Sequence, residues 1–177
     1  MSKRTIAIIG GLAAAGLIAA AVWFEPWALF TNERVDEELP EVAQSEPSDD
    51  PSESMGDEEE EEAKPVQLAA GEFVTQEHDT SGAATVIENP DGSRQLLLED
   101  LATSNGPDLR VWITDQEVDP DEWHVFDNGY WVELGELKGN EGDQVYDIPD
   151  DADLDKVTSV SIWCKRFSVS FGAAELV

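Results

Sequence analysis

Short stretches of alternating apolar and polar residues recur along the C-terminal part of the chain, with turn-forming residues between them. A helical apolar period does not stand out there, and the segments have the length and the β-branched content of strands. They lie at residues 83–87, 95–98, 109–114, 130–134, 144–148, 158–165 and 167–171. Roughly six to eight such strands in one domain are typical of an antiparallel sandwich or barrel. The pattern therefore predicts an all-β fold over residues 71–177, as a single β-sandwich or barrel-like domain.

The N-terminus carries a different pattern, because residues 5–24 are apolar and hold no charge. About 20 apolar residues are enough for a helix to cross a bilayer. Lys3 and Arg4 precede this run and acidic residues follow from Glu25, which places the N-terminus in the cytoplasm by the positive-inside rule. Residues 1–27 are thus predicted to be a cytoplasmic stub and a single-pass membrane anchor, with the C-terminal domain extracellular.

The alternative for this segment is a cleaved signal peptide, which would leave the protein secreted. Ala19, Ala20 and Ala21 offer a weak cleavage site. Bulky residues follow at once and the apolar run is long for a signal peptide, which favours the uncleaved anchor.

Residues 28–70 are poor in apolar residues and contain the run Glu58 to Glu62. Such a segment cannot bury enough apolar surface to offset its conformational entropy. It is predicted to be a disordered acidic linker. The alternative, an acidic patch that collects calcium, is less typical of a run of like charges.

The charge balance excludes one large class of partner. The chain has 40 acidic and 10 basic residues and a formal net charge of −30. A nucleic-acid-binding protein needs a basic surface that displaces counterions from phosphates, so no nucleic acid is expected as a partner. The acidic loops at 115–122 and 147–155 lack the spacing of a known calcium loop and are interpreted as solvated loops.

Few residues are available for metal or nucleophilic chemistry. The chain has one cysteine, Cys164, and two histidines, His78 and His124. This excludes an internal disulfide, a cysteine-based zinc cluster and a three-histidine metal centre. No metal site is predicted. A Ser/His/Asp set with a Gly-x-Ser-x-Gly elbow is not found, so a stand-alone enzyme is not favoured.

Cys164 is the main candidate for chemistry because the basic pair Lys165 and Arg166 follows it. Neighbouring cations lower the pKa of a cysteine whose sulfur is partly exposed and stabilise its thiolate. Strand alternation puts Val160, Ile162, Cys164 and Arg166 on one face, with Trp163, Lys165, Phe167 and Val169 on the other, unless a bulge intervenes. The alternative is a buried cysteine that acts as a small apolar residue.

Two further sets of residues have a structural and a functional interpretation. Asn105 and Asp108, in the stretch Ser104 to Asp108, either form a binding loop or specify a turn. The domain's tryptophans are either core residues or stacking surfaces for sugars. These four residues are Trp112, Trp123, Trp131 and Trp163.

Four motifs in the folded part occur in a characteristic order. They are Ser81-Gly82, the stretch Leu101 to Arg110 with Ser104-Asn105-Gly106-Pro107-Asp108-Leu109, Leu137-Lys138-Gly139-Asn140 with Gln144 and Tyr146, and Ile162 to Phe167 leading to Phe171-Gly172-Ala173. On these residues, the region 71–177 resembles the electron-transfer DM-thirteen domain family. That family occurs beside DOMON domains in animal Skeletor-type proteins and alone in bacterial membrane-anchored proteins.

The resemblance implies a role in extracellular electron transfer through the cysteine that matches Cys164. This cysteine is suggested to act as a naked thiol or to hold a prosthetic group such as haem, for which His78 and His124 are the nitrogen ligands available. Because the chain has no DOMON or cytochrome domain, a separate redox partner protein is implied. The alternative function is a non-catalytic, acidic surface-binding module for a protein or a component of the cell envelope.

Overall fold

The computed structural model describes residues 16, 31–42 and 63–177. The predicted membrane span at residues 5–24 lies outside the described residues, apart from Gly16, and so does the stretch 43–62 of the predicted linker. Within the part that is described, no helix combines the length and the apolar character needed to cross a membrane.

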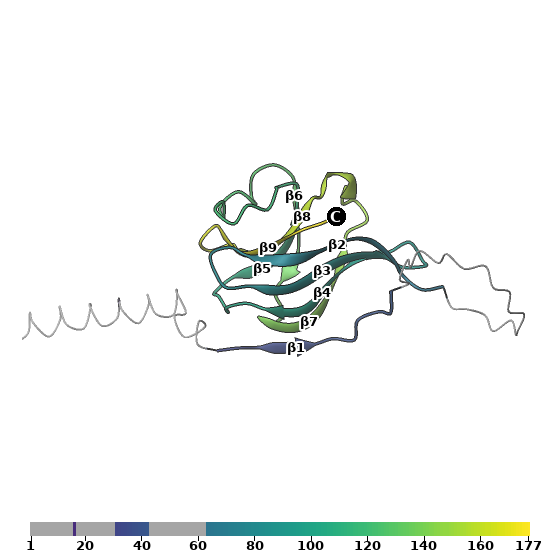
Figure 1. The fold of residues 1–177 in the computed structure, drawn as a ribbon, viewed down its shortest axis with the longest axis horizontal. Helices are drawn as coiled ribbons and strands as arrows, with labels where there is room; N and C mark the ends of the chain where they lie inside the picture. Colours follow the sequence, from purple (N-terminus) through teal and green to yellow (C-terminus); the bar gives the residue numbers. More distant parts are fainter. Residues whose placement is uncertain (1–15, 17–30, 43–62) are drawn as a thin grey trace, which may run out of the picture.

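The described residues form one sheet of nine strands (Figure 1). A short 3-10 helix, η2 (Leu154–Lys156), precedes the last two strands. The all-β class predicted from the sequence is confirmed. In chain order the strands are β1 (Arg34–Asp36), β2 (Val66–Thr75), β3 (Ser81–Glu88), β4 (Arg94–Ala102), β5 (Leu109–Thr114), β6 (Trp131–Glu136), β7 (Glu141–Ile148), β8 (Ser159–Cys164) and β9 (Val169–Glu175).

The strands follow the order β1-β7-β4-β3-β2-β9-β8-β5-β6, and the sheet curls into a half-barrel (Figure 1). All neighbouring pairs are antiparallel except β1 and β7, which are parallel. The curl brings β7 back toward the end of β6, where the Tyr146 hydroxyl donates a hydrogen bond to the Glu136 carbonyl at 3.2 Å. The predicted sandwich or barrel is therefore a single curled sheet.

The core lies inside the curl, where alternate residues of the strands meet. Leu96 and Leu98 from β4, Val111 from β5, and Ile162 and Cys164 from β8 all belong to this inner cluster. Such alternation buries one side chain in two on the inner face. A smaller cluster on the outer face holds Trp112, Phe126, Trp163 and Ala173, with Val118 and Val125 of the β5–β6 connection packed against it.

Two strands begin inside the region predicted as a disordered linker. β1 lies within it, and β2 starts at Val66 rather than after residue 70. β1 is held through backbone pairing with β7 and through the hydrogen bond from the Glu33 N–H to Asn140 Oδ1 at 2.7 Å. Because these contacts use the backbone, they leave no apolar pattern that sequence analysis can detect.

Candidate functional site

The loops that carry the four motifs named in the sequence analysis meet at one end of the sheet. The Thr103 N–H donates to the Asn140 carbonyl at 2.9 Å, which joins the β4–β5 and β6–β7 loops. The Lys165 N–H donates to the Asp108 carbonyl at 2.9 Å, which joins the β4–β5 loop to the β8–β9 turn. Motifs that are far apart in the sequence thus form one continuous surface around the end of β8.

A bulge in β9 fixes the position of Phe171 at this end. Ile162 pairs with Gly172 and Trp163 pairs with Ser170, so Phe171 is an extra residue in β9. A bulge bends its strand and turns side chains that strict alternation would place otherwise. The Phe171 ring consequently lies in the inner core at 2 % exposure.

The carbonyl and ring of Phe171 each contact a different loop. The carbonyl accepts hydrogen bonds from the N–H groups of Gln76 and His78 at 3.1 and 3.3 Å, and from the Thr80 hydroxyl at 3.1 Å. The ring packs on the His78 imidazole with centroids 3.9 Å apart. It also fills the space beside Gly106, where a Cβ atom would lie 3.0 Å from the ring. Phe171 thus connects the β2–β3 loop to the β4–β5 loop.

Cys164 ends β8 and its side chain is fully buried, at 0 % exposure. It pairs with Leu109 of β5 and Val169 of β9, and all three residues belong to the inner core. Burial raises the pKa of the Cys164 thiol above its ordinary value, and the backbone N–H groups of Phe167 and Arg166 offset this only in part. The thiol is therefore neutral at physiological pH.

The basic pair after Cys164 is divided between two environments. Lys165 points toward the outer face, where its Nζ lies 3.0 Å from Glu133 Oε2. Arg166 lies in the exposed turn, and its charge lowers the pKa of the Cys164 thiol. Of the two basic residues, Arg166 is therefore the one whose charge acts on the Cys164 thiol. Val169, predicted to lie opposite the cysteine face, shares the inner core with Cys164 because a four-residue turn separates β8 from β9.

Alkylation of Cys164 in the folded protein is expected to be at least about tenfold slower than in denaturant, because the sulfur must first be exposed by local opening. The raised thiol pKa adds to this protection, since only the thiolate reacts. Iodoacetamide labelling followed by mass spectrometry, with and without guanidinium, measures the ratio. Equal rates in the two conditions would contradict the buried position.

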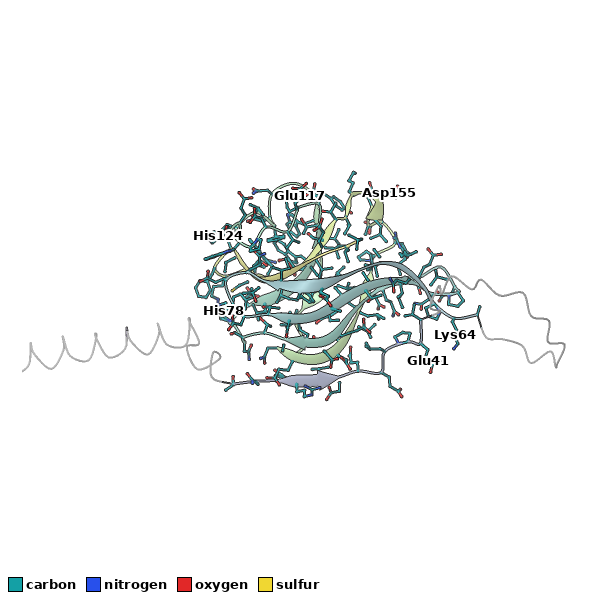
Figure 2. The ribbon with its side chains drawn as sticks, in the orientation of Figure 1. Glu41, Lys64, His78, Glu117, His124 and Asp155 are labelled. Atoms are coloured by element: carbon teal, nitrogen blue, oxygen red, sulfur yellow. The ribbon has the colours of Figure 1, made fainter. Side chains whose placement is uncertain are left out.

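The two histidines lie toward the same end of the domain (Figure 2). The His78 ring packs on Phe171, and burial lowers the pKa of this imidazole below its ordinary value. Nδ1 of the exposed His124 lies 2.7 Å from the Ser168 carbonyl oxygen. His78 thus contacts Phe171 and His124 contacts Ser168, and neither contact involves the Cys164 sulfur.

This arrangement does not fit a haem at Cys164. The sulfur is enclosed by Leu109, Val169 and the rest of the core, and an axial ligand needs an open space on its metal side. Among the described residues, no cluster of three or more His, Cys, Asp or Glu side chains is arranged to hold a metal ion. The surroundings of Cys164 therefore leave no place for a haem iron at the sulfur.

The predicted binding loop lines a pocket of about 180 Å³. Its two candidate side chains also have structural roles. The Asn105 Oδ1 accepts the Gly106 N–H at 2.8 Å, and Asp108 Oδ1 lies 2.7 Å from Arg110 Nη2. Asn105 and Asp108 thus stabilise the turn and also line the pocket, so the turn interpretation does not rule out the binding interpretation. The lining residues are Glu33, Asn105, Gly106, Pro107, Asp108, Leu109, Glu136, Leu137, Gly139 and Asn140.

The motif around Gln144 organises the β6–β7 loop. The buried Gln144 Oε1 accepts the Lys138 N–H at 3.1 Å, and its Nε2 donates to the Gly139 carbonyl at 2.8 Å. The Tyr146 hydroxyl lies 2.8 Å from the same Oε1, and burial raises the pKa of Tyr146 to about 12. The phenol therefore stays protonated and keeps donating at physiological pH. Gln144 and Tyr146 thus support the loop from behind, while Leu137, Gly139 and Asn140 of the same motif line the pocket.

Sequence reasoning missed the arrangement of three of the tryptophans. Trp131, Trp112 and Trp163 come from the neighbouring strands β6, β5 and β8, and their rings form one continuous stack. Alternation within each strand indicates which face of that strand carries the tryptophan. It does not show that β5 pairs with both β6 and β8, because strand pairing is a long-range property that the sequence pattern does not reveal.

These features define a small all-β module built around one buried thiol, with its motif loops gathered at one end. The model for the family described as Electron transfer DM13 matches residues 72–176, and the chain belongs to this family. No curated protein and no solved structure matches the chain.

Proposed function

We propose that the protein is a membrane-anchored, extracytoplasmic electron-transfer module whose redox group is the single thiol of Cys164. The observation that carries this proposal is the position of Cys164, at the point where the family's motif loops converge. Family membership supplies the redox role in general terms. The residue and the mode of transfer are our inference from the surroundings of the sulfur.

The burial of Cys164 favours one mode of redox chemistry over another. Thiol–disulfide exchange requires a thiolate that reaches a second sulfur, and a fully buried, neutral thiol meets neither condition. Transfer of a single electron requires no direct contact between the sulfur and the partner. Enclosure also protects the oxidised sulfur from the irreversible steps of cysteine oxidation.

The proposed step removes one electron and one proton from the Cys164 thiol and leaves a sulfur-centred radical. The electron passes to a one-electron acceptor on a separate partner protein. The proton passes to water at the loop end of the domain, where Asp108 lies near enough for its charge to act on the thiol. Reduction by one electron and return of the proton restore the thiol. Arg166 favours proton loss because a nearby cation stabilises negative charge on sulfur.

The anchor at residues 5–24 would hold this module outside the cytoplasmic membrane, with residues 1–4 inside. The positive-inside pattern and the length of the apolar run support this placement. Secretion after signal cleavage is the alternative, and either route exposes the β domain outside the cytoplasm. Protease treatment of intact cells that leaves only a membrane-bound N-terminal fragment would distinguish the anchored form from the secreted one.

Replacement of Cys164 by serine is expected to abolish a reversible one-electron signal in voltammetry of the full-length protein adsorbed on an electrode. The substitution removes the sulfur while it nearly preserves the side-chain volume. The control is Val169→Ala, which perturbs the packing on the paired strand and keeps the thiol. A signal that persists unchanged in Cys164→Ser would refute the assignment of Cys164 as the redox group.

The pocket beside Asn105 and Asp108 favours a second candidate function, a non-catalytic acidic module that binds a protein or an envelope component. The acidic residues Glu33, Asp108 and Glu136 line this pocket. Arg110 pairs with Asp108 and Glu136, and the acidic charge that it does not balance suits a cationic ligand. A lysine-rich peptide is expected to bind with a Kd that rises with salt and with Asn105→Ala, because salt screens exposed charges. Calorimetry that shows binding independent of both salt and Asn105 would contradict this function.

A further inference from the structure

We propose that the stacked indoles of Trp131, Trp112 and Trp163 form the electron route between the surface of the domain and the interior next to Cys164. This inference rests on the proposed electron-transfer function and adds to it a path and a docking position. The Trp131 and Trp112 ring centroids lie 4.2 Å apart with an angle of 7° between the planes. The Trp112 and Trp163 centroids lie 5.1 Å apart at 25°.

The stack runs from the surface to the interior. Trp131 is 40 % exposed, whereas Trp112 and Trp163 are 3 % and 1 % exposed. Trp131 lies on β6, the edge strand of the sheet, so a partner can approach its ring without disturbing the sheet. Indole is among the most readily oxidised side chains, and parallel rings in contact let the charge of a radical cation spread over both π systems.

The inner end of the stack lies beside the proposed redox group. Trp163 directly precedes Cys164 on β8, with the indole in the outer cluster and the thiol in the inner core. One peptide unit therefore separates the last ring from the cysteine residue. The stack supplies a route that does not require opening of the core, which explains how a fully buried sulfur can exchange an electron.

The electrostatic surroundings of the middle ring suit an intermediate positive charge. The Trp112 Nε1–H donates to Glu133 Oε2 at 3.2 Å. A carboxylate near an indole stabilises its radical cation by Coulomb attraction, and the hydrogen bond strengthens as the ring becomes positive. Lys165 and Arg110 contact the same carboxylate at 3.0 and 3.5 Å and hold it in place. Glu133 is therefore a positioning and charge-stabilising residue for Trp112.

The electron balance of the route is simple. A one-electron oxidant at Trp131 removes one electron from that ring, and the electron vacancy moves to Trp112 and then to Trp163. The thiol of Cys164 then donates one electron to Trp163 and releases its proton to water, as in the proposed function. The indoles are unchanged at the end. The surface of this strongly acidic chain favours a cationic oxidant.

The test is transient absorption and electron paramagnetic resonance of the full-length protein after oxidation by photogenerated ruthenium(III) tris(bipyridine), a cationic one-electron oxidant. In the native protein we expect an indole radical with the charge-resonance band of stacked rings, which decays as the thiol supplies an electron. Trp112→Phe is expected to lose this band and to prolong the remaining indole radical several-fold. The matched control is Trp123→Phe, which removes a tryptophan outside the stack and should leave both signals unchanged.

Two further variants separate the route from the redox group. Cys164→Ser should keep the charge-resonance band and prolong the radical. If it keeps the band but the radical decays at the native rate, the route stands and the assignment of Cys164 fails. If Trp112→Phe retains the band and the native decay, the route is refuted. Glu133→Gln keeps a hydrogen-bond acceptor without the charge and should lower the radical yield at Trp112. This variant tests the route without removal of a buried ring, so the test still holds if Trp112→Phe misfolds.

Discussion

Alanine in place of Phe171 is expected to lower the free energy of unfolding by about 3–5 kcal/mol, the range for removal of a large aromatic side chain from a core. The ring is 2 % exposed and packs against His78 and Gly106 at the same time. The loss leaves a cavity that two loops border, and of the contacts between these loops it leaves the Phe171 carbonyl and the pair of Thr80 and Thr103 hydroxyls, which lie 2.8 Å apart. We therefore expect the loop end to loosen as well.

Chemical denaturation in guanidinium measures this change through the midpoint at constant slope. Phe171→Leu is the control, because it keeps part of the apolar volume and should cost less than half as much. Hydrogen exchange at the Gln76 and His78 amides should accelerate more than exchange in β3 or β4. A loss in stability below about 1 kcal/mol for Phe171→Ala would mean that the ring is not a central part of the core.

Alanine in place of Gly82 is expected to destabilise the domain by about 2–5 kcal/mol, through backbone strain and steric overlap together. Gly82 has a φ of +117°, which residues with a Cβ atom rarely adopt. An added Cβ would also lie 2.7 Å from the Glu99 carbonyl oxygen and 2.8 Å from the Leu101 Cα. These are backbone atoms of β4, so no side-chain rotation can relieve the overlap.

Gly92→Ala is the matched control for this substitution. Gly92 also has a positive φ, of +84°, but a Cβ there would meet no atom within 4 Å. It should therefore show the strain alone, at about 1 kcal/mol. Thermal unfolding of the two variants separates the two effects. Equal losses for both would show that β3 and β4 can move apart without cost at Gly82, where the register of this strand pair shifts.

The strands that pack apolar side chains were predictable, and the strand held by backbone contacts was not. β3, β4, β5, β7 and β8 all fall on segments that the sequence pattern identified, because each buries apolar side chains in the core. β1 has the sequence Arg-Val-Asp and makes its contacts through the ladder to β7, so its residues carry no such pattern. β9 extends to Glu175, beyond the predicted end at residue 171.

Cys164 and the neighbouring loops of the candidate site could be identified from the sequence, but their geometry could not. The sequence identified Cys164 and the loops that meet around it, and it left open whether the sulfur is reactive or buried. Cys164 is buried because it pairs with both Leu109 on β5 and Val169 on β9. The pairing with β5 joins residues far apart in the sequence, so the sequence pattern does not reveal it. The bulge at Phe171 also lies outside what alternation predicts, since it changes the register of β9 by one residue.

The position of β1 changes the meaning of the acidic segment that follows it. Both ends of residues 37–65 are fixed to the same sheet, through β1 and β2, and Glu41 pairs with Lys64 at 3.1 Å (Figure 2). The run Glu58 to Glu62 therefore lies along the chain between two strands of one sheet, and not between the predicted anchor and the first strand. Under the anchor proposal, the domain is joined to the membrane span by only the few residues between position 24 and β1. Shortening the chain between β1 and β2 would change a loop-closure entropy, which varies slowly with length. It would leave the number of residues between the predicted anchor and the domain the same.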